Sequence, residues 1–435
     1  MRLFDLSLTL NGYPISKAKE TLNHIQKLTP EEKVKDILER RNSIVDYHTQ
    51  HNAFYGDRFI EHYQGDWESV PVMTKRDLQV PLHQRLSRGY DKSKVYVNKT
   101  SGSSGDPFIF AKDKWCHAMT WAQIMDRFNW YGLDFNQSIQ ARFYGTPLDP
   151  IGYRKERLKD WLTHRYRFSV FDLSDRAFDT VLNKFENQKF SFINGYTSPI
   201  VQFAKYLDRK GLILKDICNS LKVCIVTSEM LFDDDRALME QSFGVPIVNE
   251  YGASELDLIA FETPNQDWLL NSDTLYIEIL DGDNKEVPHG TEGRVVITSL
   301  FNKAHPFIRY DIGDRGIKDE KSTLTTPILK HLIGRSDDLV KLPSGKTAAG
   351  LTFYYITKSV IEKDGLVKEF VIEQTALSKF IIYYIADSDI GKEQKKLIRS
   401  EINKYLEPGL EIQMKRKTFL KRSERGKLKQ FISTI

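Results

Sequence analysis

Helical spacing of apolar residues dominates the first part of the chain. From Trp115 to Tyr131 apolar side chains recur every three or four positions, which predicts an amphipathic helix whose aromatic residues lie in the core. Residues 1–70 are also predicted to be helical and polar. Pro30-Glu31-Glu32 is typical of a helix start, because acidic side chains stabilise the first turn. No pattern in residues 1–70 indicates a functional site.

Residues 190–255 alternate between short apolar runs and helical segments. Strands are predicted at 190–196, 221–226 and 245–249, and helices at 199–207 and 233–243. Gly244 is expected to end the second helix, since glycine often closes a helix in the left-handed conformation. This alternation favours a parallel sheet with right-handed crossovers. Ligands bind at the carboxyl ends of such strands, so Asn249 to Glu255, which follow the last strand, lie at a candidate site.

From Leu275 onward the pattern predicts strands and turns, and a smaller unit follows residue 334. The β-rich section comprises strands at 276–280 and 294–298, and residues 308–314 close it. The smaller unit is predicted as a strand near 339–341, a helix at 351–362, strands at 367–373 and 379–386, a helix at 390–406 and a strand at 410–416. This β-α-β-β-α-β order is typical of a small α+β domain. The tail, 421–427, is predicted to be exposed and mobile.

Composition narrows the class of protein. A chain of 435 residues exceeds the size of most single cores, so two or more domains are expected. The net charge of +4 gives no support to nucleic-acid binding. Cys116, Cys218 and Cys224 have neither zinc-site nor redox spacing, and we interpret them as small buried hydrophobic residues in a reducing compartment, the cytoplasm. No signal peptide is expected, and no apolar run approaches the roughly 18 residues of a membrane span.

Thr100–Pro107 is a candidate phosphate-binding loop. It lies between predicted strands at 95–97 and 108–111 and combines two glycines with four hydroxyl side chains. Glycine lets backbone N–H groups approach an anion, and hydroxyls add donors, so the loop can hold a polyphosphate. It is not a Walker loop, because Asp106-Pro107 and a strand follow the second glycine where that motif has Gly-Lys-Ser/Thr and a helix. Taken alone, a solvated turn or linker is the favoured interpretation.

Residues 140–170 are rich in basic side chains. These are Arg142, Arg154, Lys155, Arg157, Lys159, Arg165 and Arg167. We interpret the stretch as a solvated face, because exposed charge is common. The alternative, in which these side chains contact the phosphates of a second substrate, stays open.

Four further polar segments follow the glycine loop in a characteristic order. They are Tyr251-Gly252-Ala253-Ser254-Glu255, Arg309-Tyr310-Asp311-Ile312-Gly313-Asp314, Gly334-Arg335-Ser336-Asp337-Asp338 and Gly426-Lys427. Together the five segments resemble those of the adenylate-forming superfamily, which includes acyl-CoA synthetases. The resemblance covers most of the chain from about Val95. It is closest to the phenylacetate-CoA ligase-like and capsule-biosynthesis (CapK-like) branch, to which Asn194-Gly195-Tyr196-Thr197-Ser198-Pro199 is also similar.

The resemblance implies an α/β fold with two domains. A large N-terminal domain, residues 1–334, would hold parallel sheets and a β-rich subdomain and bind ATP and a carboxylic acid. A small mobile α+β domain, residues 335–435, would carry the catalytic lysine, Lys427, and Asp337 would be the hinge. Taken singly, residues 334–338 are equally an ordinary linker, and a lone Gly-Lys in a basic tail indicates nothing.

Roles for individual residues come from the same resemblance. Tyr251 would pack on adenine, Asp314 would accept from both ribose hydroxyls, and Glu255 would act in catalysis by holding Mg²⁺. Core packing, a turn and a surface carboxylate are the respective alternatives. The implied ATP contacts are Thr100, Ser101, Gly102, Ser103, Ser104, Gly105, Glu250, Tyr251, Gly252, Ser254, Asp314 and Arg335, and the implied substrate contacts are Tyr196, Asn249 and Ala253.

The implied reaction is ATP-dependent activation of a carboxylic acid through an acyl-adenylate, followed by transfer to a thiol, either CoA or a carrier. ATP, Mg²⁺ and CoA are therefore the expected cofactors, with no nucleic-acid partner and a homodimer left open. Asp106 stands where many relatives have lysine, and 341–347 look more CapK-like, so the acceptor stays open. The alternatives are an adenylyl- or acyltransferase of capsule or polysaccharide biosynthesis with a different acceptor, and a non-catalytic nucleotide-binding protein of such a pathway.

Overall fold

A layer of helices opens the chain, as the apolar spacing predicts. The computed structural model describes residues 3–59, 63, 65–99, 108–144, 160, 163–335, 339–345, 347–349, 367–422 and 428–435. The first helices are α1 (Leu3–Leu10), α2 (Ile15–Lys27), α3 (Pro30–His51), α4 (Ala53–Phe59) and α5 (Leu82–Arg85). Helix α3 starts at a capping box, in which Thr29 and Glu32 each accept a hydrogen bond from the other's backbone N–H. The glycine loop, 100–107, lies outside the described residues.

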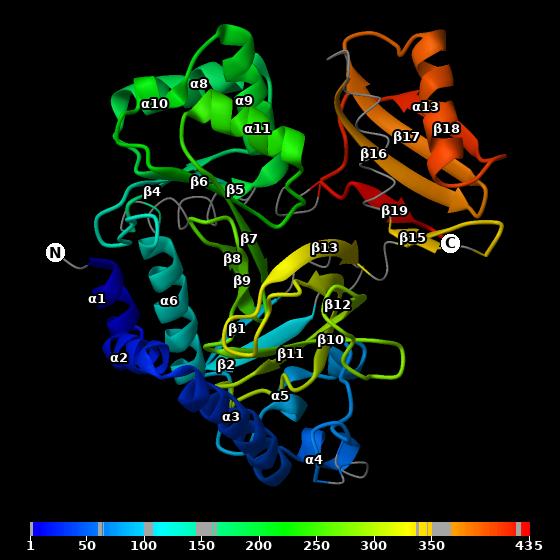
Figure 1. Cartoon of the computed structure of the whole chain (residues 1–435). Coiled ribbons are helices and arrows are strands. Elements are labelled where there is room, and N and C mark those ends of the chain that lie inside the picture. Colours follow the sequence, from blue (N-terminus) through cyan, green and yellow to red (C-terminus); the bar gives the residue numbers. More distant parts are fainter. Residues whose placement is uncertain are drawn as a thin grey trace.

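A seven-stranded sheet forms the centre of the molecule (Figure 1). Its order is β4 (Arg165–Phe168), β3 (Gln140–Phe143), β5 (Phe192–Tyr196), β6 (Val223–Thr227), β7 (Ile247–Ala253), β8 (Asp257–Glu262) and β9 (Trp268–Leu270). The first five strands are parallel, and β8 and β9 are antiparallel additions. The parallel strands β5, β6 and β7 agree with prediction, whereas β3 and β4 were not predicted. Strand β7 continues to Ala253, so Asn249 to Ala253 lie within the strand rather than after it.

Helices cover both faces of this sheet (Figure 1). One apolar core joins it to α8 (Asp175–Asn187), α9 (Thr197–Lys210), α10 (Leu214–Ile217) and α11 (Asp233–Phe243). On the opposite face, Phe128 of α6 (Lys114–Asn129) packs on Phe192 and Phe261. Gly244 follows α11 with a φ of 65°, which confirms the predicted left-handed helix end.

The β-rich section is a four-stranded antiparallel sheet. Its strands are β10 (Leu275–Leu280), β11 (Glu292–Ser299), β12 (Tyr310–Lys318) and β13 (Leu329–Arg335), in that order. The hairpin of β1 (Val95–Lys99) and β2 (Ile109–Asp113) lies beside it, and Phe108 and Phe110 enter the same core. Strand β12 brings the end of the Arg309–Asp314 segment against β13.

The C-terminal unit has its own core, built by α13 (Lys392–Tyr405) on a four-stranded sheet. The sheet order is β18 (Glu411–Arg416), β17 (Lys379–Ala386), β16 (Val367–Ala376) and β19 (Phe431–Ser433). The strand predicted near 339–341 is present as β14 (Leu339–Lys341), and it pairs with β15 (Thr347–Ala349) in a separate two-stranded sheet. Neither β15 nor β19, which lies next to β16, was predicted. The predicted helix at 351–362 lies outside the described residues, and the domain boundary at 334/335 stays a prediction.

Two expectations about the whole chain can be checked against the described residues. Cys116, Cys218 and Cys224 are buried and free, as predicted. Within the described ranges, no helix has both the length and the apolar character needed to cross a membrane.

A buried carboxylate, Asp273, joins the N-terminal helices to the β-rich section. Its side chain is 3% exposed and contacts Lys33 of α3 at 2.7 Å and Arg127 of α6 at 2.9 Å. Its backbone carbonyl accepts from Arg40 at 2.7 Å. Burial alone raises the pKa of Asp273, but the charges of Arg127 and Lys33 outweigh that effect and hold the pKa below its ordinary value. Three segments far apart in sequence therefore depend on one ionised carboxylate.

Candidate active site

The Tyr251 and Asp314 segments meet between the two sheets of the large domain. The Tyr251 hydroxyl of β7 donates to Asp314 Oδ2 of β12 at 2.6 Å, and both residues are almost fully buried. Tyr251 also belongs to the apolar core, so core packing and contact with Asp314 occur together. Asp314 lies within a strand and not in a turn, and its register partner on β13 is Arg335. The structure thus brings together three of the predicted ATP contacts.

Glu255 is buried beside a tyrosine and a lysine, so the interpretation as a surface carboxylate is wrong. The Tyr310 hydroxyl donates to Glu255 Oε1 at 3.1 Å. Lys112 of β2 forms an ion pair with Asp257 and interacts electrostatically with Glu255. Burial lowers the pKa of Lys112 to about 8, although the nearby Glu255 acts in the opposite direction. Glu255 therefore sits in a pocket of fixed hydrogen-bond donors and positive charge.

The side chains near Glu255 also decide whether the site could hold Mg²⁺. Among the described residues no group of three or more His, Cys, Asp or Glu side chains could hold a metal by itself. Mg²⁺ bound with a nucleotide needs only one or two carboxylates, because phosphates and water complete its shell. Glu255 fits that requirement as a single oxygen ligand.

Two glycines of the predicted segments are required by close backbone approach. A Cβ atom on Gly195 would lie 2.3 Å from the carbonyl oxygen of Phe143, and one on Gly252 would lie 2.5 Å from that of Asp257. Neither neighbour is a movable side-chain end, so larger residues would displace the backbone there. These glycines keep β5 tight against β3 and β7 tight against β8.

A polar cluster lies at the carboxyl ends of the parallel strands. Asn194 of β5 accepts from Gln140 at 3.0 Å and from the Tyr144 hydroxyl at 3.3 Å. The rings of Tyr144 and Tyr196 stand 4.7 Å apart. Glu250 of β7 hydrogen bonds Thr227 and interacts with Arg142. Burial raises the pKa of Glu250 to about 7, against the lowering effects of Thr227 and Arg142.

Other predicted site residues lie along β7. The backbone N–H of Asn249 donates to Glu262 Oε2 at 2.9 Å, and Ala253 is the register partner of Asp257. Gly252 and Ser254 are partly exposed. Outside the described residues lie Thr100, Ser101, Gly102, Ser103, Ser104, Gly105, Asp106, Asp337 and Lys427, and Arg335 is described by its backbone alone.

Two residues, Arg422 and Leu428, lie on either side of Lys427 in the chain and contact the large domain. Of the tail predicted to be exposed, 421–427, Lys421 is exposed and Arg422 is not, and 423–427 lie outside the described residues. Arg422 and Leu428 form an antiparallel bridge. The Leu428 N–H donates to Glu229 Oε1 at 3.1 Å, and Glu229 Oε2 accepts from Ser198 N–H at 2.7 Å. Arg422 forms an ion pair with Glu369 and donates to Ser198 Oγ at 3.4 Å. We call Ser198, Glu229, Glu369, Arg422 and Leu428 the tail clamp.

Few features of the sequence indicate the tail clamp. Glu229 stands two residues beyond β6, a strand-end position like those of the predicted contacts. That position is the one feature that indicates a functional role for Glu229. The neighbouring residues do not indicate that Leu428, 199 residues later, contacts it.

The basic stretch is not a solvated face in its described part, and that interpretation is wrong there. Arg167 is 9% exposed and pairs with buried Asp160 at 3.1 Å. Arg165 stacks on Phe4, with its guanidinium carbon 5.5 Å from the ring centroid. Arg142 lies over the ring of Tyr144 at 4.4 Å. The remaining basic side chains, Arg154, Lys155, Arg157 and Lys159, lie outside the described residues.

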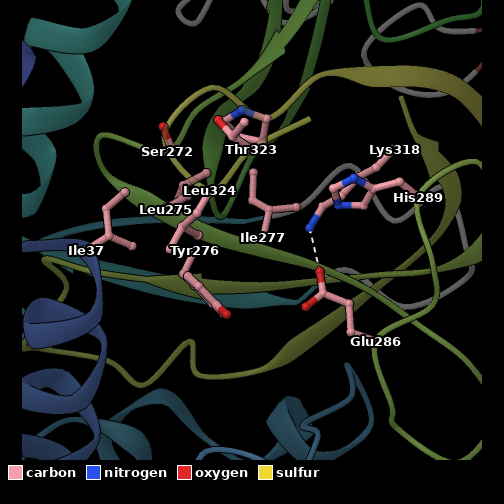
Figure 2. Close-up of a pocket in the computed structure, with 11 residues that line it drawn as sticks. Ile37, Ser272, Leu275, Tyr276, Ile277, Glu286, His289, Lys318, Thr323 and Leu324 are labelled. Carbon is pink, nitrogen blue, oxygen red and sulfur yellow. Dashed lines mark hydrogen bonds and ion pairs between the residues drawn. The ribbon is translucent and has the colours of Figure 1, made fainter. Parts of the chain in front are cut away.

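A separate cavity of about 260 Å³ lies away from these residues (Figure 2). It is lined by side chains of α3, β10 and β12, and Lys318 and Glu286 pair across it at 2.7 Å. Lys318 follows Asp314 by four positions on β12, a separation of roughly 13 Å along a strand. None of the predicted site residues lines this cavity.

Comparison with known proteins finds relatives of one kind. No family model matches the chain. It is 33% identical over 129 residues to a phenylacetate-coenzyme A ligase of Aromatoleum evansii, covering 28% of this chain and 29% of the relative. It is 29% identical over 285 residues to a phenylacetate-coenzyme A ligase of Pseudomonas putida, covering 63% of this chain and 62% of the relative. The chain thus matches less than two thirds of the length of either relative.

Among solved structures, 2-hydroxyisobutyryl-CoA ligase has the same fold. In its postadenylation state, in complex with R3-HIB-AMP, it aligns with a TM-score of 0.70 at 18% identity, covering 93% of this chain and 90% of that one. In the thioesterification state, with 2-HIB-AMP and CoA, the same ligase aligns over the same shares with a TM-score of 0.55. The predicted α/β architecture is therefore confirmed.

Proposed function

We propose that this chain is a member of the adenylate-forming superfamily, in its phenylacetate-CoA ligase-like branch, and that it activates a carboxylic acid with ATP and passes the acyl group to a thiol. A carboxylate oxygen attacks the α-phosphorus, and the bond to pyrophosphate breaks. The thiol sulfur then attacks the acyl carbon and AMP leaves. The observation that carries the proposal is the Tyr251–Asp314 hydrogen bond, which assembles two distant nucleotide-type segments at one point.

The chain's own residues have separable roles. Asp314, already accepting from one hydroxyl, is suited to accept from the ribose hydroxyls, and the buried ring of Tyr251 beside it offers an aromatic surface for adenine. Glu255 would hold Mg²⁺, which neutralises phosphate charge when bound. The hydroxyl-rich loop at 100–105 supplies donors for the phosphates. Positioning and charge neutralisation are the main demands of such a reaction.

The two half-reactions need two positions of Lys427. Its ammonium would lie at the α-phosphate during adenylation and would leave before the thiol arrives, with Asp337 as the pivot. The higher TM-score against the postadenylation state than against the thioesterification state supports a domain arrangement nearer the former. In this proposal the tail clamp holds the two residues that flank the Lys427 segment, Arg422 and Leu428, in that arrangement.

The proposal is tested by pyrophosphate release from ATP across a panel of aryl, fatty and amino acids, with and without CoA. Acid-dependent release, followed by a CoA-dependent thioester, is the expected result. Adenylate that accumulates with CoA but turns over with an amine or a sugar would identify a different acceptor, as in the capsule-type alternative. ATP binding without release for any acid would contradict the proposed activity.

Asp314 and Glu255 are expected to act on different parts of one nucleotide. Asp314→Ala should weaken ATP and AMP binding alike, by about 10-fold or more, because both carry the ribose hydroxyls. Glu255→Gln should chiefly raise the Mg²⁺ concentration needed for half-maximal adenylation. Calorimetry with both nucleotides and a metal titration measure these effects.

Tyr251→Phe is the matched control for Asp314, since it removes the hydroxyl that contacts Asp314 and keeps the ring. Metal titrations that coincide for the Asp314 and Glu255 variants would contradict the assignment of separate roles.

Loss of Glu229 is expected to slow adenylation selectively. The carboxylate accepts from two backbone N–H groups, and hydrogen bonds to charged groups contribute about 1.5–3 kcal/mol each. Glu229→Ala should therefore slow single-turnover adenylate formation by about 10-fold or more, while transfer from preformed acyl-adenylate to the thiol keeps its rate. Glu186→Ala, an exposed glutamate of α8, is the control. Equal slowing of both half-reactions would show that Glu229 has no role specific to adenylation.

A further inference from the structure

Arg142 lies on β3, three strands away from the proposed adenine contact on β7. In the parallel sheet Arg142 of β3 pairs in register with Asn194 of β5, and Thr227 of β6 pairs with Glu250 of β7. Three strand spacings, about 14 Å, separate the backbones of β3 and β7. Tyr251, the proposed adenine contact, follows Glu250 on β7. The guanidinium therefore projects from the side of the site remote from the nucleotide strand, and interacts with Glu250 across the gap.

The positive charge of Arg142 is incompletely compensated. Its side chain is half-buried, and its Nε is shielded from water without a hydrogen-bond partner. The guanidinium lies over the Tyr144 ring and interacts electrostatically with Glu250. Arg165 is a second cation close by, and burial together with the charge of Arg142 lowers its pKa. The carboxylate of Asp160 is already paired with Arg167. A shielded donor without a hydrogen-bond partner is costly, and two neighbouring cations repel each other, so a site of this kind favours an anionic ligand.

We propose that Arg142 binds a second carboxylate of the acid that this site activates, and that the preferred substrates are dicarboxylic acids. This inference rests on the proposed function. The planar guanidinium fork matches a carboxylate with two parallel hydrogen bonds. The Tyr144 ring, itself held by its hydroxyl on Asn194, keeps the fork in place from one side. One carboxylate then reacts at the nucleotide, while Arg142 holds the other at least about one inter-strand distance away.

The test compares acids in matched pairs. Butyrate with succinate, hexanoate with adipate and benzoate with terephthalate differ by one carboxylate. Full-length protein with ATP and Mg²⁺ is assayed for pyrophosphate release without thiol. We expect kcat/KM to favour the diacid by about 10- to 100-fold in at least one pair. Arg142→Gln should remove that preference while changing the monoacids less than threefold, and Arg142→Lys should restore part of it.

Controls separate this inference from the proposed function. Arg209→Gln alters an exposed arginine of α9 and should leave the preference unchanged. Preference for the monoacid in every pair, or an equal loss for both acids in Arg142→Gln, would overturn the role of Arg142 while leaving acid activation intact. A raised KM for ATP in Arg142→Gln would assign the guanidinium to phosphate instead.

A binding measurement covers the remaining case. If no acid gives pyrophosphate release, the proposed function fails, and calorimetry of succinate and adipate binding to wild type and Arg142→Gln still decides the subsite. Binding that depends on Arg142 supports it, and equal or absent binding overturns it. Arg142→Lys keeps the test valid if the glutamine variant does not fold.

Discussion

Replacing Lys427 by alanine is expected to abolish acid-dependent pyrophosphate release, by about 10²-fold or more, and to leave ATP binding intact. A point cation between the attacking carboxylate and the α-phosphate lowers their repulsion as the new bond forms, and removing one such stabilising group typically costs two to three orders of magnitude in kcat. The proposed nucleotide contacts Tyr251, Glu255 and Asp314 lie on the large domain, so ATP affinity should persist. Stopped-flow pyrophosphate release and calorimetry with ATP measure the two effects.

The structure supplies the control for Lys427. Lys429 lies two residues beyond it, after Leu428, which is anchored to Glu229. Lys429→Ala changes the same tail charge and should keep most of the turnover. Unchanged pyrophosphate release in Lys427→Ala would contradict the catalytic role. Equal losses in both variants would assign the effect to the charge of the tail instead.

Asp273→Asn is expected to lower the free energy of unfolding by about 3–5 kcal/mol at neutral pH. Removing one partner of a buried ion pair leaves the other charge without compensation, and here Arg127 and Lys33 both lose theirs. Asparagine keeps the shape, so the change reports charge and not volume. Urea unfolding followed by fluorescence and by circular dichroism measures it. Asp175→Asn breaks an exposed pair with Arg209 and should cost at most about 1 kcal/mol.

The same contact has a defined pH dependence. The pKa of Asp273 is lower in the folded than in the unfolded protein, where it is about 3.9. Its contribution is therefore fully present above that unfolded value and is lost as the pH falls through the folded pKa. The stability difference between wild type and Asp273→Asn should be constant from pH 6 to 7 and shrink below about pH 4. A difference that grows on acidification would contradict an ionised Asp273 in the folded state.

Local sequence patterns predicted those elements whose first and last residues carry clear helix-start or helix-end signals. The helix Asp233–Phe243 begins with three aspartates and ends before Gly244, and both boundaries agree with prediction. Three of the parallel strands, β5 to β7, and the order of the nucleotide-type segments were also predicted, because each depends on residues close together in the chain. Strands β3 and β4 were missed because their basic side chains were interpreted as a solvated face. The short strands β15 and β19 were missed, and the partner of β14 was not predicted. Strand pairing is a long-range choice that side-chain alternation does not encode.

Residue types alone placed Tyr251, Glu255 and Asp314 at a candidate site, but only the tertiary structure decided how they meet. The Tyr251–Asp314 bond joins residues 63 apart, and Leu428 reaches Glu229 across 199. The sequence also did not show which charged side chains are shielded from water. Arg142 and Asp273 are charged residues of the kind that usually face water, and their sequence neighbours gave no reason to expect otherwise. Their environment is set by strands and helices brought together from distant parts of the chain, so the fold turned two ordinary charges into a candidate acid-binding group and a structural ion pair.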